Sequence, residues 1–69
     1  MKWIKAVEQI EQALKTQKSV SIKYHKKYHS DDWRKYRVRH ITDDEIICDA
    51  FRCSVRINKS NYIIDEVII

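Results

Sequence analysis

The residues in this chain best suited to chemistry are basic and aromatic side chains that alternate through its middle third. Residues 20–40 contain seven Lys and Arg residues against two Asp residues, so the segment carries a net charge of +5, whereas the whole chain carries +4. Single-stranded nucleic-acid binders combine cations that follow the phosphates with rings that stack on the bases. The segment therefore predicts a strand-binding face whose contacts are salt-dependent and weakly sequence-specific. Its candidate binding residues are Lys23, Tyr24, Lys26, Lys27, Trp33, Arg34, Lys35, Arg37 and Arg39.

A structural interpretation of the same residues stands beside this one. Tyr24 and Tyr36 suit a hydrophobic core, and Trp33 suits the cap of a small barrel, while the charged side chains are simply solvated. The pattern of residue types alone fits both interpretations.

Catalytic machinery is sparse in this sequence. The chain has no glycine, which excludes a glycine-rich phosphate loop, and its serines lie in no nucleophile motif. The acidic pairs Asp31-Asp32 and Asp43-Asp44 are typical of turns. We therefore expect a protein that is not an enzyme and needs no cofactor.

Two histidines and two cysteines are the remaining candidates for a metal site. His25 and His29 flank a loop-like stretch, and Cys48 and Cys53 stand further apart than in a zinc knuckle. We expect two buried thiols and two surface histidines, with no metal. A disulfide is the less favoured alternative, because small secreted domains normally carry more than one pair of cysteines.

Composition points to one small domain of 69 residues with a globular balance of apolar and charged side chains. No apolar run approaches the roughly 18 residues that span a bilayer, and no signal-peptide pattern is present, so we expect a cytoplasmic protein without membrane contact.

One helix and about five strands must position these residues. Trp3, Val7, Ile10 and Leu14 recur at helical spacing, with Ile4 and Ala13 alongside, which predicts an amphipathic helix over residues 3–17. Alternation and turn signals predict strands over 19–25, 33–41, 46–51, 53–57 and 62–69, with a break or bulge near Arg52. Within 33–41, one face carries Trp33, Lys35, Arg37, Arg39 and Ile41, and the other carries Arg34, Tyr36, Val38 and His40.

This order of elements predicts a mainly β fold. We expect an N-terminal helix over residues 1–18 and a small SH3/Sm-like barrel over residues 19–69, together one domain. The apolar end Val67-Ile68-Ile69 suits either a central strand of a closed sheet or an edge that another chain covers.

Residues 11–69 resemble the WYL domain, a small Sm-like or SH3-like β-barrel of bacterial regulators and of proteins tied to phage defence and DNA damage. The matching motifs are Ala13-Leu14, Ser21-Ile22-Lys23-Tyr24, Arg37-Val38-Arg39-His40 with His40 in place of proline, Ile46-Ile47-Cys48 with Ala50-Phe51, Cys53-Ser54-Val55-Arg56, and the register of 60–67. Two arginines of the family pattern are Ser60 and Glu66 in this chain.

The resemblance implies binding of nucleic acid or nucleotide-like ligands, with Tyr24, Arg37 and Arg56 in the family's binding positions. We expect an accessory protein that binds single-stranded DNA or RNA, a larger DNA-processing enzyme, or both. Homo-oligomers are compatible with the sequence. The alternatives are a pure protein-interaction subunit and a small regulator from a phage or mobile element.

Overall fold

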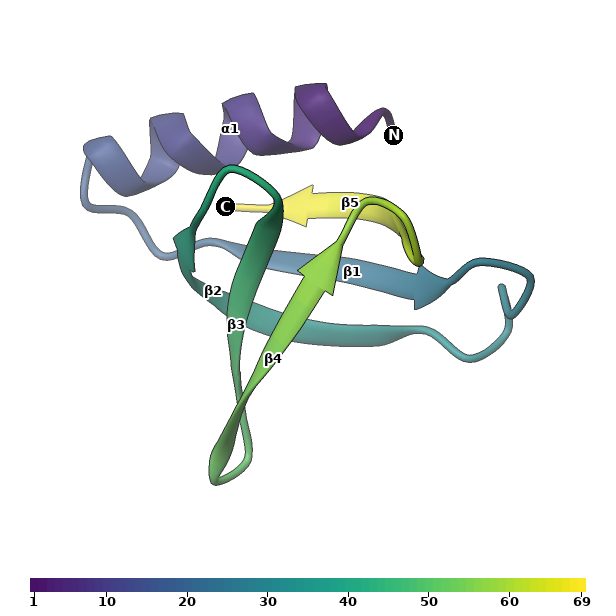
Figure 1. The fold of residues 1–69 in the computed structure, drawn as a ribbon. Helices are drawn as coiled ribbons and strands as arrows, with labels where there is room; N and C mark the ends of the chain where they lie inside the picture. The colour runs from purple at the N-terminus through teal and green to yellow at the C-terminus, as the bar shows by residue number, and fades with distance from the viewer.

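The computed structural model describes residues 1–69 as one helix lying against one antiparallel sheet (Figure 1). The strand order in the sheet is β4-β3-β2-β1-β5, so β4 and β5 are the two edges and the sheet is not closed. The prediction of a mainly β domain with an N-terminal helix is confirmed. The elements are α1 (Trp3–Lys15), β1 (Ser21–Lys26), β2 (Arg34–Ile41), β3 (Glu45–Ala50), β4 (Cys53–Asn58) and β5 (Tyr62–Ile68).

Two register shifts bend the sheet. One lies between Lys23 and Tyr24 where β1 meets β5, and the other lies at Arg39 where β2 meets β3. A bulge adds a residue to one strand and increases its local bend and twist. The shift at Arg39 also reverses the sides of the residues after it, so Ile41 packs against the core and His40 is exposed. The predicted alternation through residue 41 is therefore wrong beyond Arg39.

The core lies between α1 and one face of the bent sheet. The helix contacts β5 and β2, and Figure 1 shows it running above β5. Ile4, expected beside the buried stripe, is 67% exposed, because at 100° per residue it stands about 120° from Ile10 around the helix. The core residues are Ala6, Ile10, Ala13, Val20, Ile22, Tyr24, Val38, Ile46, Cys48, Ile57 and Ile64.

Three tight connections place non-glycine residues in the left-handed region of backbone space. Gln17 follows the helix with φ 58°, Tyr28 lies between β1 and β2 with φ 69°, and Arg52 lies between β3 and β4 with φ 64°. The predicted break near Arg52 is thus the turn of a β3–β4 hairpin. Phe51, expected in a strand, lies on this turn and is 85% exposed.

Two further expectations about burial are wrong. Cys53 is exposed at the start of β4, whereas Cys48 is buried, and both thiols are free. His25, expected on the surface, is buried, and it pairs with Asp65, the extra residue of β5 at the register shift. No helix in the structure is long and apolar enough to cross a membrane.

Candidate nucleic-acid interface

The face of the sheet turned away from the core carries a row of basic side chains along β2. This strand has the sequence RKYRVRHI, with four Arg or Lys residues and no acidic residue. Lys35 and Arg37 alternate with the core-facing Tyr36 and Val38, so both point away from the core and are exposed. Because β2 lies between β1 and β3, this row runs through the middle of the sheet rather than along an edge.

Cross-strand pairing extends the basic row across the sheet. On β1, Lys23 lies opposite Lys35, which places two cations side by side on the same face. On β4, Arg56 lies opposite Ile47 of β3 and is exposed. We call this surface the outer basic face; it consists of Lys23, Trp33, Lys35, Arg37, Arg39 and Arg56.

Trp33 provides a partly exposed aromatic ring beside the row. The Lys23 ammonium lies 4.5 Å from the centroid of the ring, within the range of a cation–π contact. The residue is 49% exposed, so it does not bury itself as the cap of a barrel would. A ring held by a cation and open to solvent can stack on an unpaired base.

Acidic side chains neutralise only part of the outer basic face. Arg39 lies with its Nε 3.8 Å from a carboxylate oxygen of Asp49, and its Nη1 donates a long hydrogen bond to Ser54. Glu66 lies opposite Lys23 at the boundary with β5. Lys35 and Arg37 take part in none of the protein's ion pairs, so both retain free donors for a phosphate.

The core-facing side of the sheet holds a second group of candidates, built from three tyrosines. Tyr24 lies between the other two rings: its centroid is 6.3 Å from that of Tyr36 and 5.5 Å from that of Tyr62, the latter pair packed edge to face. Tyr24 is buried, whereas Tyr36 and Tyr62 are half-buried. The cluster draws its rings from three neighbouring strands, since β5 and β2 flank β1.

A cavity of about 220 Å³ opens beside these rings; we call it the tyrosine pocket. Burial raises the pKa of Tyr24 to about 12, so its hydroxyl keeps its proton near neutral pH. Arg34 lies at the pocket with its Nη1 donating to Asp32 over 2.7 Å. The pocket is lined by Tyr24, Lys26, Asp32, Arg34, Tyr36, Val55 and Tyr62.

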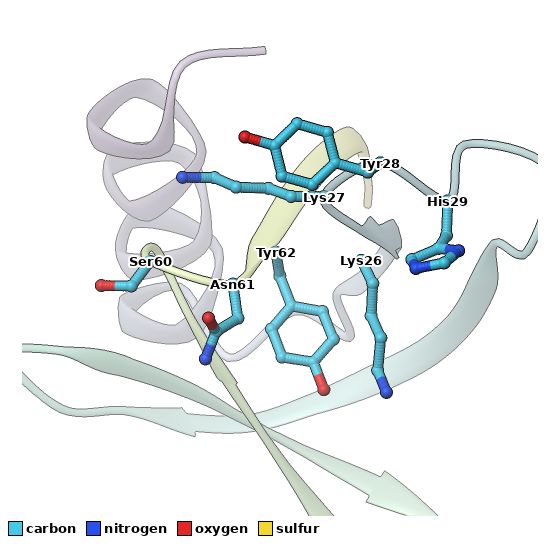
Figure 2. Close-up of a pocket in the computed structure, with 7 residues that line it drawn as sticks. All are labelled: Lys26, Lys27, Tyr28, His29, Ser60, Asn61 and Tyr62. Carbon is cyan, nitrogen blue, oxygen red and sulfur yellow. The ribbon is translucent and has the colours of Figure 1, made fainter.

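A wider hollow of about 380 Å³ adjoins the tyrosine pocket and shares Lys26 and Tyr62 with it. These two residues lie opposite each other on β1 and β5, and Figure 2 shows their side chains extending in the same direction. Lys27 and Tyr28 extend to the other side of the chain (Figure 2). The hollow thus joins the tyrosine pocket through one cation and one ring.

The structure divides the predicted binding residues between two sides of the sheet. Lys23, Trp33, Lys35, Arg37, Arg39 and Arg56 lie together on the outer basic face. Tyr24, Lys26 and Arg34 line the tyrosine pocket, and Lys27 lies apart in the β1–β2 turn. Sequence reasoning missed Tyr62 as a site residue; its place two residues before Ile64 in an alternating strand marks it only as core-facing.

A part-buried polar pair joins β1 to β5 next to this region. His25 Nδ1 lies 2.7 Å from Asp65 Oδ2. A carboxylate can only accept, so the Nδ1–H of His25 donates this hydrogen bond. The pair therefore has a structural role. His25 is committed to Asp65, whereas His29 lies at the wider hollow. No three His, Cys, Asp or Glu side chains come together as a metal site.

Taken together, these elements define a small antiparallel β domain covered by one helix, with an outer basic face and a core-side tyrosine pocket. Comparison of the chain with protein-family models, with curated proteins and with solved structures finds no match to any of them.

Proposed function

We propose that this protein binds single-stranded nucleic acid through its outer basic face, as a non-enzymatic accessory to a larger nucleic-acid-processing protein. The single observation that carries the proposal is the middle of the sheet: β2 presents Lys35 and Arg37 beside the exposed ring of Trp33, and neither cation forms an ion pair, although Asp49 lies opposite Arg37 on β3. Cations at this spacing follow phosphates, and the ring stacks on a base.

The arrangement favours a flexible single strand over a duplex. The face is a bent sheet with one exposed ring, whereas duplex readers insert a helix or a two-stranded ribbon into a groove. The only helix packs its apolar side against the sheet, and no basic recognition helix is present in residues 1–69. A base stacked on Trp33 must be unpaired, which a single strand satisfies without cost.

We further propose that the sheet is an open form of the small SH3/Sm-like barrel and that the chain is a divergent, stand-alone WYL-like domain. The strand order β4-β3-β2-β1-β5, a meander whose last strand returns beside the first, supports this reading. The two bulges support it as well, because a sheet approaches closure through bends at such positions.

Fluorescence anisotropy with a labelled single strand tests the nucleic-acid proposal. The wild-type protein binds at low salt, and log Kd rises linearly with log salt concentration. Replacing Lys35 and Arg37 together with Ala weakens binding by about tenfold or more. The slope of log Kd against log salt concentration falls by about 1.4, which corresponds to the loss of two phosphate contacts on a single strand.

A matched control removes the same charge elsewhere. Lys2 and Lys5 are exposed on or beside α1, on the other side of the molecule from β2's exposed row, and their replacement with Ala leaves the affinity within about twofold. An absence of binding at low salt, or an equal loss in both double variants, contradicts specific use of the outer basic face.

A protein-interaction module is the second candidate, because specific apolar groups are exposed around unpaired edges. Phe51 at the tip of the β3–β4 hairpin is 85% exposed and Ile69 after the edge strand β5 is 66% exposed. Exposed strand edges pair readily with another chain. Under this alternative a partner raises the melting temperature of the protein, and nucleic acid has no effect on it.

A further inference from the structure

The tyrosine pocket has features that packing alone does not require. Its three hydroxyls belong to Tyr24, Tyr36 and Tyr62, and none of them enters a hydrogen bond within the protein. Tyr24 is 4% exposed, yet its side chain lines the cavity. No buried side-chain nitrogen or oxygen lacks a hydrogen-bond partner, so these unbonded hydroxyls are accessible rather than sealed in the core, where phenylalanine would fill the same volume without a polar group. The pocket therefore presents unused polar groups to a ligand.

We propose that the tyrosine pocket is a second binding site, which holds one nucleoside 5′-monophosphate group. The site is on the core-facing side of the sheet, and the proposal is independent of strand binding on the outer basic face. The group belongs either to a free mononucleotide or to the phosphorylated end of a strand.

The base fits the aromatic part of the pocket by shape and by polarity. The rings of Tyr36 and Tyr62 stand on either side of Tyr24, and Val55 adds an apolar wall. A volume of about 220 Å³ lies below the range of roughly 300–1,000 Å³ typical of drug-sized ligands, so it suits a single planar base. The hydroxyls favour a ring with polar edges, because a hydrocarbon ring leaves them unpaired.

The phosphate fits the cationic edge of the pocket. Lys26 forms no ion pair within the protein. Arg34 uses only Nη1 for its bonds to Asp32 and to the Trp33 carbonyl, so its remaining N–H groups are free to bind phosphate oxygens. The wider hollow beside Lys26 and Tyr62, about 380 Å³, leaves room for the sugar. Asp32 holds the guanidinium in place at the edge of the pocket.

Titration of the isotope-labelled protein with adenosine and uridine 5′-monophosphates, followed by NMR, tests this site. The expected result is saturable shifts of the ring signals of Tyr24, Tyr36 and Tyr62. Replacing Lys26 and Arg34 together with Gln raises the Kd about tenfold or more, since two charge-assisted contacts are lost. The matched double variant on or beside α1, Lys2→Gln with Lys5→Gln, removes the same charge outside both sites and leaves the Kd within about twofold.

Smaller probes separate the two halves of the ligand. The nucleoside without phosphate and inorganic phosphate without base each bind about tenfold or more weakly than the monophosphate. Tyr36→Phe keeps the ring, removes one hydroxyl and weakens binding by about threefold to tenfold while the backbone spectrum stays that of the folded protein. A 5′-phosphorylated trinucleotide that binds more tightly than the mononucleotide identifies a strand end as the source, and equal affinity identifies a free nucleotide.

Three results overturn the proposal. The first is no saturable shift at millimolar monophosphate. The second is inorganic phosphate binding as tightly as the monophosphate, which marks a simple anion site. The third is an equal loss of affinity in the Lys2/Lys5 and Lys26/Arg34 variants. Because strand binding is measured with variants of the outer basic face, a failure here leaves that result unaffected.

Discussion

At the scale of single residues, the side chains that matter most are polar groups whose surroundings the sequence does not reveal. His25 is buried and donates to Asp65, forty positions away along the chain. The ring of Tyr24 is buried between those of Tyr36 and Tyr62, and its side chain lines the tyrosine pocket. For His25, burial turns an ordinary surface residue type into one that affects stability, because a buried polar group that loses its partner costs free energy.

The His25–Asp65 hydrogen bond can be removed by a single substitution. Asp65→Ala leaves the His25 Nδ1–H without its acceptor at a buried position, and we expect the free energy of unfolding to fall by about 1–3 kcal/mol. Urea denaturation measures the loss. Glu66→Ala, on an exposed neighbour in the same strand, serves as the control and changes stability by about 0.5 kcal/mol or less. Equal effects in the two variants contradict a structural role for the pair.

Stability must also decline at high pH through two buried acids. Burial raises the pKa of Tyr24 from 10.0 to about 12, and burial together with Asp49 raises the pKa of Cys48 from 9.0 to about 12. Above pH 9 the folded protein therefore holds more protons than the unfolded chain. The stabilisation of the folded protein by the protonated Tyr24 and Cys48 side chains is complete below pH 9 and is lost as the pH rises towards 12.

Urea midpoints measured between pH 8 and pH 11 check this decline. Tyr24→Phe keeps the ring but has no titratable hydroxyl, so its urea midpoint falls less steeply above pH 10 than that of the wild type. Identical slopes in the two proteins contradict the burial of a protonated phenol at this position.

At the scale of elements, the chain makes its turns without glycine. Gln17 has φ 58° directly after the helix, where its N–H donates to the Leu14 carbonyl, and the N–H of Lys18 donates to the Ala13 carbonyl. Left-handed backbone costs a residue with a Cβ about 1–2 kcal/mol, and glycine is the usual residue at such helix ends. The end of α1 is thus strained by its residue type.

Glycine at this position should stabilise the protein. Gln17→Gly removes the strain but adds chain entropy to the unfolded state, so we expect a net gain of about 0.5–1 kcal/mol in the free energy of unfolding. Thermal and urea denaturation measure it. Lys18→Gly, next to it but without positive φ, lowers stability instead. A loss of stability in Gln17→Gly contradicts the left-handed conformation.

At the scale of the whole molecule, one small core, packed between α1 and one face of the bent sheet, must stabilise the entire fold. Only 12 of the 69 residues are buried, so opening of the core exposes most of what stabilises the fold. Cys48 lies within that core, whereas Cys53 is exposed on the first residue of β4. The two thiols therefore report on different states of the same protein.

Alkylation by iodoacetamide separates these states. Cys53 reacts in the native protein, whereas Cys48 reacts only when the core opens, at a rate slower by orders of magnitude under native conditions. Mass spectrometry of the time course counts the labels. A strand that binds the outer basic face slows labelling of Cys48 further, because a ligand of the folded state lowers the open fraction. Equally fast labelling of both thiols contradicts a closed core.

The sequence by itself determined the helix and strands of this protein and the basic row along β2. Periodicity located the helix and the strands to within about two residues at most ends, because amphipathic patterns are local. Alternation along β2 correctly separated Lys35 and Arg37 from Tyr36 and Val38, since successive strand residues point to opposite sides. The basic row was therefore predictable from the residue types together with their alternation along the strand.

Only the tertiary structure decided where the bulges fall and which strands become the edges of the sheet. The bulge at Arg39 reverses the sides of the residues that follow it, which returned Ile41 to the core and exposed His40, and the extra residue of β5, Asp65, pairs with the buried His25. The long-range order of strands brought Tyr62 beside Tyr24 and left β4 and β5 as unpaired edges. These features depend on pairings between distant segments, and no local pattern of residues encodes which strands will become neighbours.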